Sequence, residues 1–284
     1  MEPGFLSFAE HCPDAVMVTD AAGTIEYVNA AFERITGYRS AELVGRTPAL
    51  LKSGTHEADF YRGLWSALKA GREFQAVFVN RRKDGGLYYE EKIIRPLPGG
   101  RFASFGRDAT ARAREFEKLA HAATHDSLTD LPNRGLFLDR LAQALHQAAR
   151  RNEPLTAAIL DIDRFKDTNT RHGHLGGDAV LQAVAARTRG CIRETDTVAR
   201  IGGDEFALVL SGAGEAQAAP VLEKIVAANA APVPFGEDRI KVTVSVGACA
   251  GLGDAAGAED LRRHADAAMY AAKSSGGNCY VFYR

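Results

Sequence analysis

The segment TVARIGGDEFALVL, residues 197–210, decides the fold of the second half of the chain. Two apolar-rich stretches flank Gly202 and Gly203, which predicts two strands joined by a tight hairpin with both glycines at positive φ. Two adjacent carboxylates, Asp204 and Glu205, follow directly. Acids on a bare glycine tip suit a divalent metal and an anionic substrate, because nothing bulky blocks their approach. A solvent-exposed hairpin with a charged tip is the alternative for this segment taken alone.

A second acidic segment follows a predicted core strand. Residues 155–160 are mostly apolar, which is typical of a strand buried on both faces. Asp161 comes directly after this run, so we expect it to be held rigidly and exposed at the rim of the sheet, as a metal ligand should be. For Asp163, a cap of the next helix is the alternative. Residues 164–167 predict the first turn of that helix, where free N–H groups bind phosphate and Lys166 adds a mobile positive charge.

The run Gly202-Gly203-Asp204-Glu205-Phe206 resembles the signature of the GGDEF family, the diguanylate cyclases that join two GTP into cyclic di-GMP. Further blocks of that family stand in order on both sides: DSLTDLPNR (126–134), DIDRFKDTN (161–169), GHLGGD (173–178), VTVSVGACA (242–250) and DAAMYAAKSSGGN (266–278). The resemblance covers residues 126–284 and implies an α/β sandwich similar to nucleotidyl cyclase and polymerase palm domains. Within these residues, the apolar pattern predicts a helix at 221–228 and a strand at 240–248.

The resemblance implies a site for two Mg²⁺ ions per GTP. The ligands would be Asp161, Asp204 and the backbone carbonyl of Ile162. Glu205 would be either a further ligand or the base that prepares the attacking 3′-hydroxyl, and the sequence leaves both open. The reaction would be an in-line phosphoryl transfer, in which the protein mainly positions substrate and neutralises charge. Each half-site would hold one GTP, so catalysis would need a homodimer.

The other substrate contacts follow from the same resemblance. Asn169 and Asp178 match the positions that bind guanine, and an amide and a carboxylate fit the hydrogen-bonding edge of that base. Lys273 matches a triphosphate-binding lysine. The remaining predicted substrate-binding residues are Phe165, Gly202 and Gly203. The family usually has Arg four residues after the lysine, where this chain has Gly277, which removes one phosphate contact.

An inhibitory product site is implied by the RxxD motif of the family. Arg193 and Asp196 match it in residue type and in their distance from the signature. The arginine could grip a phosphate or a guanine edge while the aspartate accepts from guanine. An ordinary Arg–Asp pair at a helix end is the alternative. We predict feedback inhibition by cyclic di-GMP.

The first part of the chain predicts a small α/β sensor. We expect strands at 15–20, 24–28, 74–80, 87–95 and 101–106, and helices at 30–35 and 57–70. Asn29 stands where a cap of the first helix would, and Gly37 and Tyr38 would end that helix. This order, with the stretches DAVMVTDAAGTIEYVNAAFERITGY, LKSGTHEADFYRGLWSALKAG and NRRKDGGLYYEE, resembles a PAS domain over residues 13–110. Such domains sense a ligand, a cofactor or a partner in the cup of their sheet.

Residues 51–84 look most like flavin-binding sensors, which suggests FAD as a cofactor. Asn80 could hydrogen-bond the edge of the flavin ring, and Trp65 or Phe74 could pack on its face. The alternative is that both aromatic residues belong to the core and Asn80 is structural. Haem bound through His56 is a weaker candidate. A light-sensing flavin domain is excluded because residues 37–69 contain no Cys.

Residues 108–125 contain no Gly or Pro and predict a helical linker with a thin apolar seam. In this architecture such a linker resembles a signalling helix that pairs in a dimer, and a solvated monomeric helix is the alternative. The expected organisation is therefore a PAS domain at 1–107, a linker at 108–125 and a GGDEF domain at 126–284.

The composition of the 284 residues restricts the partners and the compartment. The net charge of −1 argues against a nucleic-acid or anionic-membrane binder. No apolar run approaches the ~20 residues of a membrane span, and the first residues do not resemble a signal peptide. The four cysteines are widely separated, which favours free thiols and a cytoplasmic location.

The function expected from these features is that of a cytoplasmic, homodimeric, PAS-regulated diguanylate cyclase. A non-catalytic GGDEF domain that only binds GTP or cyclic di-GMP is the rival. In a third alternative the PAS domain binds no cofactor and only dimerises.

Overall fold

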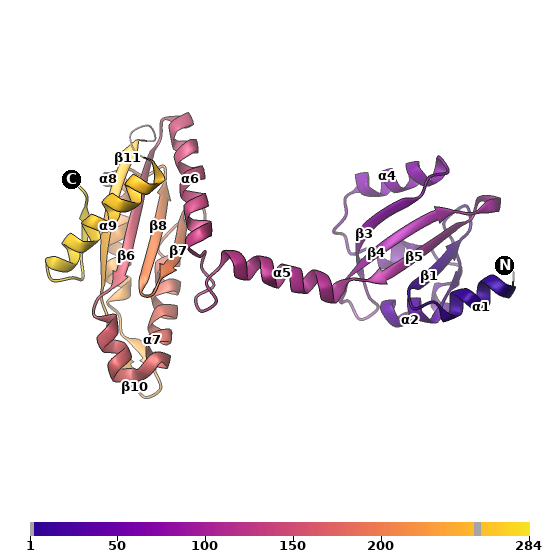
Figure 1. Ribbon diagram of the computed structural model, residues 1–284, viewed down its shortest axis with the longest axis horizontal. Helices are drawn as coiled ribbons and strands as arrows, with labels where there is room; N and C mark the ends of the chain where they lie inside the picture. Colours follow the sequence, from indigo (N-terminus) through magenta and orange to yellow (C-terminus); the bar gives the residue numbers. More distant parts are fainter. Residues whose placement is uncertain (1–2, 253–256) are drawn as a thin grey trace. The chain divides into compact units, whose positions relative to one another are not determined.

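The computed structural model describes residues 3–252 and 257–284. The chain divides into two compact units, residues 1–119 and 120–284, and the boundary falls inside the helix α5 (Thr110–Thr124; Figure 1). The helix predicted for the linker is therefore present. The domain limits at 107, 108–125 and 126 stay our proposal.

The first unit is built on one antiparallel sheet in the order β2-β1-β5-β4-β3. Its strands are β1 (Ala15–Thr19), β2 (Ile25–Val28), β3 (Phe74–Arg81), β4 (Leu87–Pro96) and β5 (Phe102–Asp108). Its helices are α1 (Pro3–His11), α2 (Ala30–Thr36), α3 (Ser40–Leu43), η1 (Pro48–Leu51), α4 (Ala58–Lys69) and η2 (Pro98–Gly100).

The start and the end of α2 show how the sequence sets a boundary. The Asn29 side chain accepts from the N–H of Phe32 at 2.9 Å and so satisfies one of the free donors of the first turn. Gly37 ends the helix at φ 77°, a conformation that costs glycine little. Both signals had been predicted from the sequence and are confirmed.

The second unit has a five-stranded sheet in the order β12-β11-β6-β8-β7. The strands are β6 (Pro154–Ile162), β7 (Thr197–Gly202), β8 (Glu205–Ser211), β11 (Val244–Leu252) and β12 (Tyr280–Phe282), and a separate ladder joins β9 (Val233–Phe235) to β10 (Asp238–Ile240). The helices are α6 (Arg134–Arg151), α7 (Phe165–Arg189), α8 (Glu215–Asn229) and α9 (Ala258–Ser274).

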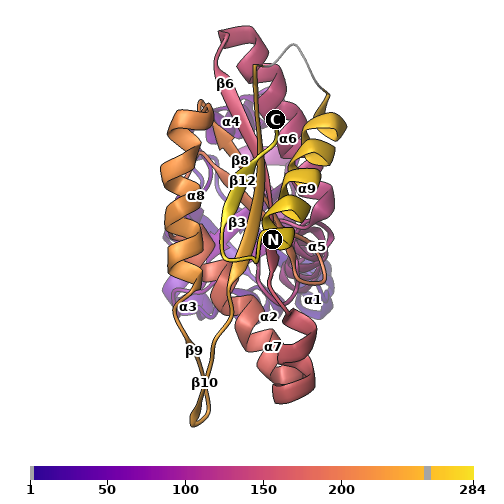
Figure 2. The same ribbon diagram turned by 90° about the vertical axis from the view of Figure 1, so that its left-hand side faces the viewer.

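Helices cover both faces of this sheet (Figure 2). One core joins α7 and α8 to the face that carries Leu160 and Phe206, and the other joins α6 and α9 to the face that carries Ile159 and Ala207. In β6, the central strand, eight of nine residues are buried, as the apolar run predicts. The mixed α/β class expected from the sequence is confirmed.

Several details of the second unit differ from expectation. The helix expected at 221–228 begins earlier, at Glu215, and contains Pro220. The strand expected over 240–248 is divided between β10 and β11, and the short β9–β10 hairpin had not been predicted. Within the described residues, no helix has the length and apolar character needed to cross a membrane.

Candidate active site

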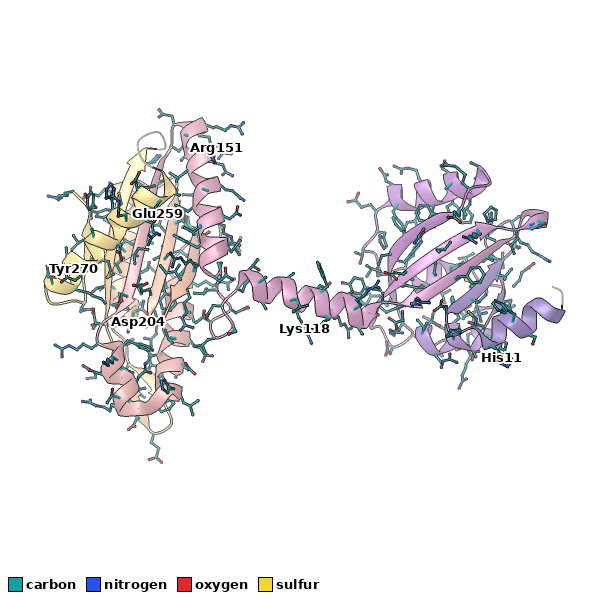
Figure 3. The ribbon with its side chains drawn as sticks, viewed as in Figure 1. His11, Lys118, Arg151, Asp204, Glu259 and Tyr270 are labelled. Carbon is teal, nitrogen blue, oxygen red and sulfur yellow. The ribbon has the colours of Figure 1, made fainter. Side chains whose placement is uncertain are left out.

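The tip of the β7–β8 hairpin differs from the expected turn. Gly202 pairs with Glu205 in the ladder, so Gly203 and Asp204 are the two turn residues. Gly203 has a positive φ of 38°, but the φ of Gly202 is not positive. The expectation that both glycines have positive φ is therefore wrong. A Cβ at either glycine would meet no atom within 4 Å, so the space beside the tip is open. Figure 3 labels Asp204 at this tip.

Asp161 lies opposite the hairpin but is not exposed at a rim. It is the next-to-last residue of β6, pairs with Glu205 on β8 and Ser245 on β11, and is only 5% exposed. The strand continues past this acid because Ile162 is also buried and paired, with Val244. Burial, together with the charges of Asp204 and Glu205, raises the pKa of Asp161 to about 6, although Lys273 acts to lower it.

Lys273 reaches this acid from the last turn of α9. Its Nζ lies 2.6 Å from Oδ1 of Asp161, so the ammonium group pairs with this carboxylate. Asp161 is only 5% exposed, and a carboxylate removed from water in this way is costly unless a cation or a donor satisfies it.

The acids at the hairpin fit a magnesium ion that is completed by substrate. Across 3–252 and 257–284, no three His, Cys, Asp or Glu side chains converge closely enough to hold a metal alone. Magnesium, however, usually takes one or two carboxylates and completes its shell with water and substrate phosphates. Asp161 is buried close to the charges of Asp204 and Glu205, which help to raise its pKa, and a nearby cation would offset this negative charge. Asp161 and Asp204, with the carbonyl of Ile162, could supply the protein ligands.

Asp163 has a structural role that the sequence did not reveal. Its carboxylate accepts the hydroxyls of Thr243 and Ser245 at 2.6 Å and the N–H of Asn278 at 2.9 Å. The side chain does not cap α7, so that alternative is wrong. Asp163 instead joins the end of β6 to the start of β11 and to the turn before β12.

The predicted guanine-binding residues lie together on α7. Both Asn169 and Asp178 are half-buried, and Gly173 interrupts the helix between them at φ 69°. A Cβ on Gly177 would overlap Oδ1 of Asn169, so the missing side chain leaves room for that amide. Phe165 is partly buried at the start of the same helix and packs against the core, and Lys166 is exposed.

Arg200 is a site residue that the sequence analysis missed. Its Nη1 donates to both oxygens of Asp126 at 3.0 and 3.2 Å, and its Nε and Nη2 donate to the carbonyl of Gly203 at 3.0 and 2.7 Å. Burial acts to raise the pKa of Asp126, but hydrogen bonds from Thr129 and Arg200 hold it below the ordinary value. The guanidinium thus fixes the turn that carries Asp204. The sequence signal for this role was the charged side chain of Arg200 within the mostly apolar stretch that forms β7.

The predicted inhibitory residues lie in the segment between α7 and β7. The carboxylate of Asp196 accepts the N–H groups of Arg193 and Ser211, both at 3.1 Å. In the described part of the chain, no ion pair joins the Arg193 guanidinium to Asp196, so the two side chains do not satisfy each other as a simple pair. Both residues line a cavity of about 640 Å³.

The first unit contains a separate cavity of about 300 Å³. Asn80 and Trp65 line it, whereas Phe74 packs edge-on against Phe60 and Phe78 and is not among the lining residues. The lining is largely apolar, and Lys92 supplies a positive charge.

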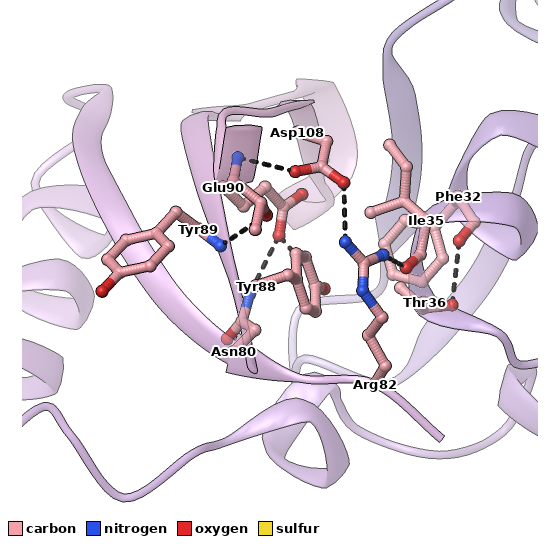
Figure 4. Close-up of polar contacts among 10 residues, drawn as sticks. Phe32, Ile35, Thr36, Asn80, Arg82, Tyr88, Tyr89, Glu90 and Asp108 are labelled. Carbon is pink, nitrogen blue, oxygen red and sulfur yellow. Dashed lines mark hydrogen bonds and ion pairs between the residues drawn. The ribbon is translucent and has the colours of Figure 1, made fainter. Parts of the chain in front are cut away.

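Buried polar residues lie beside this cavity, and Figure 4 shows the contact between two of them, Asn80 and Glu90. Asn80 donates to Glu90 at 2.9 Å, and Nζ of Lys92 lies 3.0 Å from the same carboxylate oxygen. Glu90 and Lys92 are 1% and 4% exposed, so their charges offset one another away from water. A Cβ on Gly106 would overlap the carboxylate of Glu90, which explains glycine at this position.

The same close-up shows how the sheet holds the start of α5. Asp108 accepts from Arg82 at 2.7 Å and from the N–H of Thr110 at 2.8 Å, and the Thr110 hydroxyl accepts the N–H of Tyr89 at 3.1 Å. Arg82 also donates to the carbonyl of Ile35, at the end of α2. The first turn of the linker helix is therefore fixed to the sensor sheet.

Comparisons with known proteins agree with both resemblances. The family model "Diguanylate cyclase, GGDEF domain" matches residues 123–279, and the model "PAS fold" matches residues 5–97. An uncharacterised signalling protein of Caulobacter vibrioides is 35% identical over 277 residues, covering 94% of this chain and 33% of its own length. The diguanylate cyclase TpbB of Pseudomonas aeruginosa is 43% identical over 161 residues, covering 56% of this chain and 37% of its own. The chain thus spans about a third of the length of these relatives.

A solved structure is also similar. The coiled coil and GGDEF domain of DgcB from Caulobacter crescentus, in complex with c-di-GMP, aligns with a TM-score of 0.57 and 31% identity, covering 61% of this chain and 92% of that one. The predicted order of a PAS domain followed by a GGDEF domain is confirmed.

Proposed function

We propose that this chain, which belongs to the family of diguanylate cyclase GGDEF domains, joins two molecules of GTP into cyclic di-GMP and releases pyrophosphate. The observation that carries the proposal is the buried carboxylate of Asp161, paired with Lys273, beside the hairpin acids Asp204 and Glu205. Burial of this carboxylate costs stability, which indicates that the site is built to bind a cation.

Several residues of the site would each contribute to phosphoryl transfer. Enzymes of this family generally use Mg²⁺, which would neutralise the triphosphate charge when held by Asp161, Asp204 and the carbonyl of Ile162. Lys273 would move from Asp161 to a phosphate oxygen, and the exposed Lys166 would add a second positive charge.

The nucleotide would be placed by α7 and the hairpin. Asn169 and Asp178 would hold guanine, and the open space at Gly202 and Gly203 would admit the phosphates. Glu205, half-buried beside the tip, would accept the proton of the 3′-hydroxyl as the new ester bond forms and pyrophosphate leaves.

A homodimer would bring two such half-sites together. Phe116 and Leu119 on α5 are 72% and 60% exposed, which is unusual for large apolar side chains on a helix. Pairing of α5 with its copy in a second chain would cover them. Phe116→Glu should shift the chain toward monomer in light scattering and lower the cyclase rate, and an unchanged dimer would rule out this interface.

Regulation is proposed at two places. Arg193 and Asp196 would bind cyclic di-GMP and cause feedback inhibition.

In the sensor cavity we propose a flavin, with its ring against Trp65 and its polar edge at Asn80 and Lys92. His56 does not favour haem, since its Nε2 accepts the N–H of Val79 at 2.8 Å and its ring stacks on Phe60. The absorption spectrum of the purified protein tests this: a flavin band supports the proposal, and a blank spectrum or a Soret band rejects it.

The rival function is a GGDEF domain that binds nucleotide without catalysis. Gly277 favours it, because this position lacks the arginine usual in the family. Incubation with GTP and Mg²⁺, followed by chromatography of the nucleotides, separates the two functions. The cyclase should yield cyclic di-GMP, and Asp204→Asn should yield none. Binding of GTP without any product would establish the rival. The cytoplasmic location of this chain stays a prediction.

A further inference from the structure

The cavity that contains Arg193 and Asp196 extends to the C-terminal end of α5. Its volume of about 640 Å³ lies within the range in which proteins bind small molecules. His121, in the last turns of α5, and His125, just after that helix, line it. All of these residues belong to the unit 120–284, so the arrangement does not depend on the sensor.

The two histidines form an ordered stack. Their rings lie 4.0 Å apart between centroids with an interplanar angle of 9°. Nε2 of His121 is 2.6 Å from Oδ1 of Asp130, and Nδ1 of His125 is 2.9 Å from the hydroxyl of Thr124. The stack gives the cavity a flat wall of two imidazole rings.

The other charges of the cavity cancel. Three guanidinium groups line it, from Arg140, Arg189 and Arg193. Three carboxylates oppose them, from Asp130, Glu194 and Asp196. The two imidazoles are the remaining titratable groups of the lining, so their protonation decides whether the cavity is neutral or positive. A cyclic dinucleotide carries two phosphodiester charges and would be attracted more strongly to the positive form.

We propose that His121 and His125 form part of the inhibitory site and make binding of cyclic di-GMP stronger as the pH falls. This inference rests on the proposed inhibition through Arg193 and Asp196, and it adds the regulation of that site by pH.

The test is calorimetric binding of cyclic di-GMP to the full chain at about pH 5.5 and about pH 8. The test variant is His121→Gln with His125→Asn, which keeps a donor near Asp130 and an acceptor near Thr124 but cannot gain a proton. His146→Gln is the matched control, since His146 is exposed on α6 and does not line the cavity. The wild-type chain and the control should bind roughly tenfold more tightly at the lower pH, and the test variant should lose this difference.

Two different results would overturn two different claims. If the wild-type chain binds, Arg193→Ala weakens binding and the histidine variant keeps the full pH dependence, the histidine inference alone is wrong. If the wild-type chain does not bind, or Arg193→Ala binds equally well, the inhibitory site itself is wrong. A test variant with an unchanged melting temperature and a lost pH dependence supports the inference, because a purely structural role of the stack would not change the pH dependence selectively.

Discussion

Nζ of Lys273 lies 2.6 Å from Oδ1 of Asp161, so the end of α9 places a positive charge on the acid that we propose as a metal ligand. A metal ion and Lys273 would therefore compete for one oxygen. If the metal takes Asp161, the lysine becomes free to contact the triphosphate. The pair would thus couple occupation of the proposed metal site to the charge available for substrate.

Asp161→Asn should stabilise the protein at neutral pH in metal-free buffer. Burial raises the pKa of Asp161 from 3.8 to about 6, so the folded state keeps a proton that the unfolded chain has released between these values. The free energy of unfolding therefore falls as the pH rises from about 4 to about 6. Removal of the acid should recover roughly 1–3 kcal/mol at pH 7 and little below pH 4, measured by denaturant unfolding with a chelator.

The exposed acid Asp139 on α6 provides the control for this experiment. Asp139→Asn should leave the dependence of unfolding free energy on pH unchanged. Parallel curves for Asp161→Asn and the wild-type chain would show that Asp161 is not held at a cost in the folded state.

Arg200→Met should lower kcat by about a hundredfold, because the turn carrying Asp204 would lose the hydrogen bonds at the carbonyl of Gly203. Steady-state cyclase kinetics check this, with Arg151→Met at the exposed end of α6 as the control (Figure 3). A kcat equal to that of the control would mean that the turn keeps its geometry without Arg200.

Gly177→Ala should raise KM for GTP by roughly tenfold with a smaller change in kcat. The added methyl group would overlap the amide of Asn169 and displace it from the proposed guanine site. Gly63→Ala on α4 is the control, since a Cβ there meets no atom within 4 Å. An unchanged KM would indicate that Asn169 does not bind the base.

Gly277→Ala should destabilise the protein more than Gly276→Ala. Both glycines have positive φ, at 75° and 109°, and an L-residue in the left-handed region costs about 1–2 kcal/mol. Only at Gly277 would the Cβ also approach an oxygen of Asp163, to 2.8 Å, and disturb the contacts that this carboxylate makes. Melting temperatures compare the two variants, and equal losses would remove the proposed role of Asp163 as an anchor.

Local signals in the sequence predicted much of the fold. The cap at Asn29, the stop at Gly37 and the apolar run of β6 each depend on a few neighbouring residues, and each was placed correctly. The turn of the β7–β8 hairpin was misplaced by one residue, because a Gly-Gly pair does not say which glycine belongs to the ladder.

The features that the sequence did not reveal depend on distant contacts. Asp163 meets Thr243, Ser245 and Asn278, which are far from it along the chain, so nothing local distinguishes it from a helix cap. The burial of Asp161 follows from its pairing with both β8 and β11. In each case, the tertiary contact assigns a role that the residue type alone leaves open.

The most direct test of the central claim is the rate of cyclic di-GMP formation from GTP and Mg²⁺ by the wild-type chain and by Asp161→Asn, with pyrophosphate measured in the same samples. We predict two pyrophosphates for each cyclic di-GMP in the wild-type reaction and a rate at least about a hundredfold lower in the variant. A wild-type chain that binds GTP but forms no product, or a variant as active as the wild-type chain, would contradict the account.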